Sequence, residues 1–427
     1  MTSAPRQWIT RAQPGTIAAA AALVRGTPPH ALLIVGPPSV GKTTLADDLA
    51  AGLLCLDPDP SRRPCRTCRG CLLVAAGNHP DLHRLGPEGP GGQIVIGDSA
   101  RAAPRGVRNL VGELAYLPVE GGRRVAIVEH ADRMNEDAQN ALLKSLEEPP
   151  AGVSLILCAD DEDRLLTTVR SRCVRLRVSP LGIRAIEELL GERGAADPTR
   201  AARLARIAGG RPGLALAYAR LPEAVTIHDE IARTLLDLLG SSRAVRLVTG
   251  RELLERAAAL DLALRPVVAP SLPPARLPRG MRRGTSAAQS GTTSAPAAAG
   301  DPGVRGVLGV PGVPGVPGVL ESAAEPQPGG TRRPPAERRR ALLTLIAIWR
   351  DLALDLAIVT LGGRREVRDP TLLDDLVGVA GTVEPGRVGA FLARLDRLAE
   401  LIEGNAGPEL GLDVLVLTWP HAVAPAA

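Results

Sequence analysis

The sequence contains very few aromatic residues, which make up only 1% of its 427 positions, while 45% of the residues are apolar. Folded cores in this chain must therefore be built mainly from Ala, Val, Leu and Ile. Such a composition favours helices and a buried parallel sheet over a β-sandwich. The length predicts two to four domains.

Long apolar runs are also missing. The most apolar region, 342–361, is interrupted by Arg350, Asp351 and Asp355, so it predicts a packed helix and not a membrane span. The first residues, MTSAPRQWITRAQ, lack the basic-then-apolar pattern of a secretory signal. From these absences we expect a reducing, cytoplasmic setting and no membrane partner.

Lysine is nearly absent, because only Lys42 and Lys144 interrupt a basic complement made otherwise of arginine. Lys42 belongs to GPPSVGKT at 36–43, which follows the apolar run 31–35 and precedes a helical pattern. A loop of this spacing between a strand and a helix cradles phosphates with its backbone amides; the lysine reaches the outer phosphates, and the threonine hydroxyl binds Mg²⁺. The nucleotide-binding residues predicted from this loop are Gly36, Gly41, Lys42, Thr43 and Thr44. Whether ATP and Mg²⁺ are bound and turned over is a separate question.

Five short apolar runs alternate with helical patterns in the first part of the chain. They lie at 31–35, 81–85, 124–129, 153–158 and 174–178. This alternation predicts a parallel sheet covered on both faces. From about residue 181 onward the pattern is helical.

A segment at 263–335 interrupts the helical region. It holds 14 Pro, 12 Gly and 8 Arg against 3 acidic residues, so its net charge of +5 equals that of the whole chain. Such a composition predicts a disordered insert, and its role is open between a spacer, a tether for an anionic partner and a neutral expansion. The folded remainder is near neutral, so its bulk charge does not predict DNA binding.

Four cysteines follow the phosphate loop closely. Cys55, Cys65, Cys68 and Cys71 include two overlapping C-x-x-C steps, which match a tetrahedral structural zinc site. The residues between them offer no core, so the metal is expected to hold this loop together. Cys158 and Cys173 lie outside the cluster and are expected to be small buried residues.

These motifs together resemble a known family. HALLIVGPPSVGKT, the four cysteines, NHPDLHRL, ADRMNEDAQNALLKSLEEPP and SRC resemble bacterial clamp-loader subunits of the AAA+ class, and most of all the delta-prime branch of the DNA polymerase III clamp-loader family. The resemblance implies an α/β nucleotide-binding domain at 1–179 with a zinc module at 55–71, a helical lid at 180–222, and a helical collar at 223–262 and 336–427.

The resemblance also implies partners. These are the gamma/tau and delta subunits, and through the complex the sliding clamp and primed DNA. A nucleotidyltransferase activity would belong to the chain only by membership of the complex, because no polymerase carboxylate constellation is visible.

The chain departs from the motor subunits of this family where they hydrolyse ATP. Glu129 and His130 stand where the motor has Asp-Glu, so Glu129 is expected near Mg²⁺ while His130 lacks the carboxylate that acts on water. Asp160 stands near the position of a phosphate-sensing threonine, and Gly213 at that of a nucleotide-contacting arginine. These departures predict weak or absent hydrolysis.

Ser171-Arg172-Cys173 keeps the family's arginine motif. The resemblance implies that Arg172 reaches into the ATP site of a neighbouring subunit as an arginine finger, a role suited to a permanently charged, forked side chain. We therefore predict a delta-prime-like clamp-loader subunit.

Three alternatives remain at the level of sequence. The chain could be a gamma/tau-like ATPase motor, or an interaction subunit that binds no nucleotide. The cysteine loop could also bind nucleic acid through Arg62, Arg63, Arg66 and Arg69, although it lacks an aromatic residue for stacking.

Overall fold

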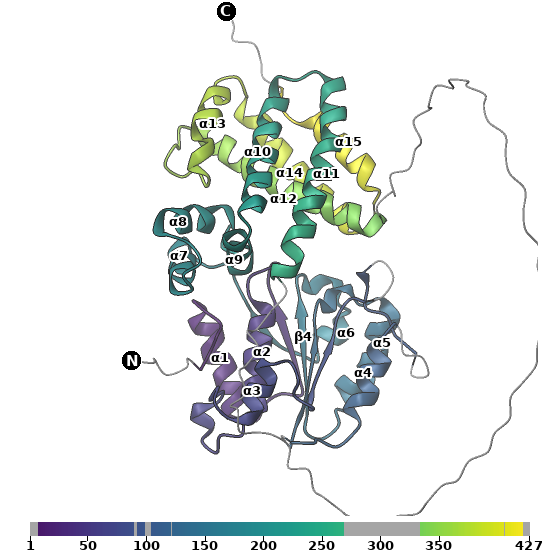
Figure 1. Cartoon of the computed structure of the whole chain (residues 1–427). Coiled ribbons are helices and arrows are strands. Elements are labelled where there is room, and N and C mark those ends of the chain that lie inside the picture. Colours follow the sequence, from purple (N-terminus) through teal and green to yellow (C-terminus); the bar gives the residue numbers. More distant parts are fainter. Residues whose placement is uncertain are drawn as a thin grey trace, which may run out of the picture. The chain divides into compact units, whose positions relative to one another are not determined.

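The computed structural model of the chain describes residues 7–88, 92–98, 104–120, 122–268, 334–404 and 406–421 (Figure 1). Of the predicted insert, residues 269–333 lie outside this description. Among the described helices, none has the length and apolar character needed to cross a membrane.

A five-stranded parallel sheet forms the first part of the fold. Its strands are β1 (Ala31–Val35), β2 (Leu82–Leu85), β3 (Arg124–Val128), β4 (Val153–Ala159) and β5 (Val174–Arg177). They pair in the order β2-β3-β4-β1-β5, with Leu33 opposite Leu157 and Arg175. The five predicted strands are therefore confirmed. Because all pairings are parallel, the carboxyl ends of β1, β3 and β4 meet at one edge of the sheet.

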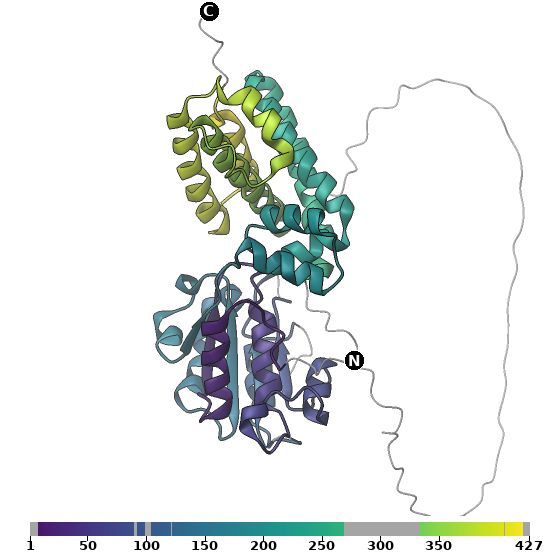
Figure 2. The same cartoon turned by 90° about the vertical axis from the view of Figure 1, so that its left-hand side faces the viewer.

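Helices cover both faces of this sheet, as the composition predicts. Leu32 and Ile34 of β1 face one core, and Leu33 faces the other, because successive side chains of a strand point to opposite faces. The first core is covered by α1 (Pro14–Arg25), α2 (Lys42–Leu53) and α3 (Arg69–Ala75), and the second by α4 (Val107–Leu114), α5 (Glu136–Glu147) and α6 (Thr167–Arg170). Figure 2 shows α1 and α2, in purple, crossing in front of the strands.

Helix α5 illustrates how sequence sets local structure. The Asn135 side chain accepts a hydrogen bond from the Ala138 amide at 3.0 Å and so caps the first turn. Ala138, Leu142 and Leu146 are buried against the sheet, as their spacing predicts. The predicted cap and the predicted buried face are both confirmed.

In the described part of the chain, nine further α-helices follow the sheet. They are α7 (Ile183–Glu192), α8 (Pro198–Ile207), α9 (Pro212–Arg220), α10 (Pro222–Asp237), α11 (Arg243–Val268), α12 (Pro335–Thr360), α13 (Leu373–Ala380), α14 (Pro385–Glu403) and α15 (Pro408–Thr418). Their buried side chains form one apolar cluster, in which α11 and α12 pack together although the insert separates them in sequence. Helix α11 continues to Val268, so the helix runs six residues past the predicted start of the insert at residue 263.

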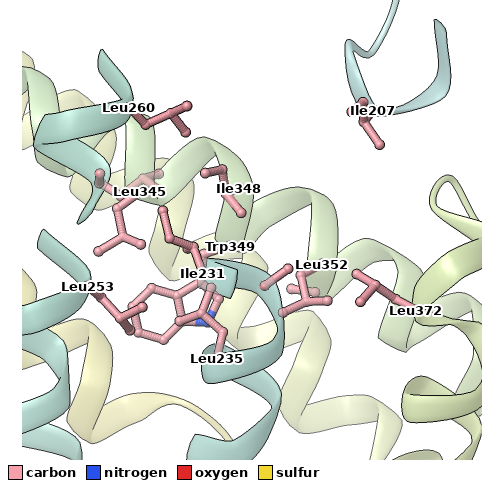
Figure 3. Packing of buried hydrophobic residues seen from close by; sticks show 14 of the residues in the cluster. Ile207, Ile231, Leu235, Leu253, Leu260, Leu345, Ile348, Trp349, Leu352 and Leu372 are labelled. Atoms are coloured by element: carbon pink, nitrogen blue, oxygen red, sulfur yellow. The ribbon is translucent and has the colours of Figure 1, made fainter. Parts of the chain in front are cut away.

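Three of the six aromatic residues gather in the helical region. Trp349, Phe391 and Trp419 pack against one another in edge-on or tilted orientations, with ring centroids 4.7–5.5 Å apart. Trp419 also donates a hydrogen bond to the Leu235 carbonyl at 2.9 Å. Figure 3 shows Trp349 packed near Ile231, Leu235 and Leu253, so large rings fill the junction of α10, α11 and α12.

A buried carboxyl in α12 predicts a pH dependence. Asp355 is 3% exposed and accepts hydrogen bonds from the Arg368 and Asp369 amides. Burial outweighs these bonds and raises its pKa from 3.8 to about 6. The folded state therefore holds this proton more tightly than the unfolded state, and stability is lost as pH rises from about 4 to about 6.

We expect Asp355→Asn to remove this loss. The difference in the free energy of unfolding between the variant and the parent chain should be more favourable to the variant at pH 7 than at pH 4, by about 3 kcal/mol. Urea unfolding followed by tryptophan emission at both pH values measures this difference. The same difference at both pH values would show that Asp355 does not titrate in this range.

Candidate phosphate-loop site, arginine finger and four-cysteine module

The phosphate loop has the geometry that its sequence predicts. Gly41 caps α2 with a φ of 104°, a conformation that disfavours other residues. A Cβ on Gly36 would lie 2.1 Å from the Val178 carbonyl oxygen, so that position also requires glycine. Gly41, Lys42, Thr43, Thr44 and Glu129 line one cleft, while Gly36 lies beneath the loop against Val178.

The Lys42 ammonium is fully engaged by the protein itself. It is 7% exposed and donates to the Gly36 and Pro37 carbonyls at 2.7 and 2.8 Å. Its third contact is Asp160 Oδ1 at 2.5 Å, from the carboxyl end of β4. An ammonium has three protons to donate, so a phosphate must displace one of these acceptors.

Asp160 carries a negative charge at this point. Burial alone would raise its pKa, but hydrogen bonds and charge from His130 and Lys42 outweigh burial and lower the pKa to about 2. His130 Nδ1 lies 3.4 Å from Asp160 Oδ2, and His130 adopts a φ of 53° directly after β3. The charge of Asp160 would repel a phosphate, and Asp160 also binds the lysine that would attract one.

Glu129 lies in the cleft but is paired with an arginine. Arg84, from β2, contacts Glu129 Oε1 at 3.0 Å and also forms an ion pair with Asp47 on α2. A metal ion bound by Glu129 would compete with this cation. The sequence pattern did not reveal Arg84, because its two partners come from two segments that are distant from it in sequence.

The segment predicted to be a lid contacts the phosphate loop through backbone atoms. The Gly213 amide donates to the Ser39 carbonyl at 3.0 Å, and a Cβ on Gly213 would lie 3.0 Å from that oxygen. Arg211 lines the cleft, and its Nε donates to the Ala208 carbonyl. In this structure Gly213 therefore serves as a close contact and supplies no charge.

A buried glutamine links α5 to the loop after β4. Gln139 accepts a hydrogen bond from the Leu166 amide at 2.7 Å and donates to the Met134 and Arg164 carbonyls. Sequence reasoning missed this residue. Gln139 could have been found from its position, because it is a polar residue three positions before Leu142 and so lies on the buried face of the helix.

Arg172 is partly exposed at the end of α6. Its guanidinium donates to the Thr168 carbonyl at 2.8 Å and contacts Glu147 Oε1 at 2.8 Å. It is 35% exposed, and Glu147 is 51% exposed. Because surface ion pairs are weak, this contact leaves Arg172 available to a stronger anion.

The four predicted cysteines come together in space. The sulfur atoms of Cys55, Cys65, Cys68 and Cys71 all lie within 4.8 Å of one another, and all four are free thiols. Backbone amides point at three of the four sulfurs, including those of Leu56 and Cys71 toward Cys68 Sγ at 3.4 Å. The donor set fits a tetrahedral zinc ion held by thiolates. Cys158 is buried and Cys173 is partly buried, each against an apolar core as expected.

The arginines of this module already have partners in the chain. Arg69 contacts Glu120 Oε1 at 2.7 Å, and Arg62 lies 3.6 Å from Asp57. Arg63 donates to the Asp57 carbonyl, and Arg66 pairs with Asp48. The contacts of Arg63 and Arg66 draw these two charges toward the protein, whereas Arg62 and Arg69 stay 67% and 56% exposed in weak surface pairs.

The fold and the site define a P-loop α/β domain, with helices following the sheet. Residues 17–182 match the family described as DNA polymerase III, delta subunit. The chain is 40% identical over 184 residues to the DNA polymerase III subunit delta' of Pseudomonas aeruginosa, covering 43% of this chain and 53% of that protein. The chain is 39% identical over 189 residues to the DNA polymerase III subunit delta' of Escherichia coli, covering 44% of this chain and 54% of that protein.

A tau subunit is also similar. The DNA polymerase III subunit tau of Escherichia coli is 33% identical over 186 residues, covering 42% of this chain and 27% of that protein. The resemblance of the N-terminal region to the delta-prime branch of the clamp-loader family is confirmed, with tau and gamma as relatives. The chain spans about half the length of the delta' relatives described here.

Two solved structures from Thermotoga maritima align over longer stretches. A DNA polymerase III gamma-subunit-related protein is 21% identical and covers 60% of this chain and 77% of its own, with a TM-score of 0.32. The RuvB Holliday junction branch migration motor is 16% identical, and the alignment covers 52% of this chain and 66% of that one, with a TM-score of 0.36. Scores this low support no functional comparison.

Proposed function

We propose that this chain is a delta-prime-like subunit of a DNA polymerase III clamp loader. In this proposal it hydrolyses little or no ATP itself, and it supplies Arg172 to the ATP site of a neighbouring gamma/tau subunit. A delta subunit completes its partners, and the sliding clamp and primed DNA are reached through the complex.

The observation that carries the proposal is the contact between Lys42 and Asp160. The lysine that would hold the outer phosphates is paired with an ionised carboxylate of its own chain. His130 adds to this, because an imidazole beside Asp160 is not the carboxylate base that prepares water in a motor. The match of residues 17–182 to the family described as DNA polymerase III, delta subunit, and the similarity to delta' proteins over 184 residues support the same assignment.

The parts of the chain are assigned accordingly. Residues 1–179 form the nucleotide-site domain with Zn²⁺ in the module at 55–71, and 180–222 form the lid. The predicted collar at 223–262 and 336–427 is extended to 223–268 and 335–427, because α11 runs to Val268 and α12 begins at Pro335, and the insert lies between these two helices. The proposal includes weak binding of ATP with Mg²⁺ in the cleft, because the phosphate-loop sequence from Gly36 to Thr43 is complete.

Arg172→Ala tests the arginine finger. In a complex reconstituted with gamma/tau and delta subunits, we expect DNA-stimulated ATPase to fall roughly tenfold, because one interface loses the cation that stabilises its transition state. Assembly, followed by size-exclusion chromatography, should be unchanged because Arg172 is a partly exposed surface residue.

Arg175→Ala is the matched control. Arg175 is 45% exposed on β5 and pairs with Glu162 at 3.4 Å, so its loss removes a similar surface charge. Unchanged ATPase in the Arg172→Ala complex would contradict the finger. Rapid turnover by the isolated chain, abolished in Lys42→Ala, would instead establish a motor.

A further inference from the structure

One arginine of the four-cysteine module points into the protein. Arg66 lies between Cys65 and Cys68 and has a φ of 64°. Its guanidinium is 10% exposed, forms an ion pair with Asp48, and donates through Nε to the Gln7 carbonyl at 2.8 Å. The conformation of the cysteine loop thus decides where this charge lies.

The partner of Arg66 organises the N-terminal segment. Asp48 of α2 is fully buried and accepts hydrogen bonds from the Ile9 and Thr10 amides at 3.2 and 2.8 Å. The Thr10 hydroxyl adds a third bond at 2.7 Å. A buried carboxylate is costly unless it is paired, so these contacts and Arg66 depend on one another.

This segment also forms part of the cleft wall. Ile9, Thr10 and Arg11 line the same cleft as the phosphate loop. Trp8, beside them, is partly buried against the core that Cys65 and Cys68 also contact. The four-cysteine module and the cleft are therefore joined through one short stretch of chain.

We propose that Arg66 is a positioning residue through which metal occupancy of the four-cysteine module holds residues 7–10 against α2, and so shapes one wall of the cleft. The module lacks an apolar core of its own, so its loop depends on thiolate–metal bonds for its conformation. Loss of the metal frees the loop and withdraws Arg66. Asp48 is then left buried without its cation, and residues 7–10 are released.

Metal removal from the full chain is the first test. Chelation of Zn²⁺ should shift Trp8 emission to the red, and hydrogen exchange at the Ile9 and Thr10 amides should accelerate roughly tenfold or more. Trp8→Phe should abolish the emission change, because Trp349 and Trp419 lie in the helical core. Unchanged exchange in β3 confirms that the domain stays folded.

Two substitutions separate the arginine from the metal. Arg66→Met should release residues 7–10 while the chain still binds one equivalent of Zn²⁺; Arg62→Met, which changes an arginine 67% exposed in the same module, should not. Asp48→Asn changes the partner of Arg66 on α2 and leaves the cysteine module itself unaltered, and it should also release residues 7–10. If Arg66→Met fails to bind zinc, the result for Asp48→Asn decides the test.

The proposal is overturned if metal removal leaves Trp8 emission and the Ile9 and Thr10 amides unchanged. It is also overturned if Asp48→Asn, with zinc retained, leaves them unchanged. Neither readout requires nucleotide or partner subunits, so this inference stands or fails separately from the proposed clamp-loader function.

Discussion

Asp160→Thr is expected to tighten ATP binding to the isolated chain by a factor on the order of 100, or about 2.7 kcal/mol. The substitution removes an anion from the cleft and frees Lys42 Nζ, which now lies 2.5 Å from Asp160 Oδ1. Charges at such separations interact by several kcal/mol near a protein surface. Part of this gain in ATP binding is offset, because the Lys42–Asp160 attraction is lost. Hydrolysis is not expected to appear, because His130 remains.

Titration calorimetry with ATP and Mg²⁺ measures this effect. Asp161→Thr is the matched control, because Asp161 is the next residue and is 50% exposed. Lys42→Ala, combined with Asp160→Thr, should abolish the gain. Equal affinity of the parent chain and Asp160→Thr would show that this ion pair does not limit binding.

Arg246→Met is expected to destabilise the helical region by about 3–5 kcal/mol, the range found when a buried, fully bonded charge loses its interactions. Arg246 is completely buried in α11. Its guanidinium donates to the Trp419, Val416 and Pro420 carbonyls at the end of α15, and to Leu239 and Ser241 after α10.

These acceptors explain the size of the effect. The last carbonyls of a helix have no partner within the helix, and one cation here satisfies the ends of two helices. Burial lowers the pKa of Arg246, yet the five bonds keep it in place. Methionine fills similar space but donates nothing, so the carbonyls are left buried without donors.

Urea unfolding followed by the emission of Trp349 and Trp419 measures the loss. Arg251→Met, one to two turns further along α11 at an exposed position, should change stability by no more than about 0.5 kcal/mol. Equal midpoints for the two variants would contradict a capping role for Arg246.

Much of the α/β domain was predictable from local pattern. The five strands, the phosphate loop, the Asn135 cap and the buried face of α5 all follow from spacing along the chain, because each depends on residues close in sequence. The gathering of four cysteines was predictable for the same reason, since their spacing limits how far apart they can lie.

Other features required tertiary structure. The helix continuing to Val268 was missed because a proline, here Pro266, usually interrupts a helix, whereas Leu264 of α11 is buried in the helical core. The role of Arg246 could not be predicted, because nothing in the local sequence shows that two helix ends, one about 170 positions away, converge on it.

The sequence by itself determined the phosphate loop and the four-cysteine cluster, because these are short patterns whose geometry depends on local spacing. Only the tertiary structure decided how these parts are used. It brought Asp160 onto Lys42 across 118 positions, Arg84 onto Glu129, and Arg66 onto Asp48. The partner of each charged side chain depends on which segments lie beside it in the folded chain. These pairs form where the ends of the parallel strands and the N-terminal segment come together, and local sequence does not show which segments these are.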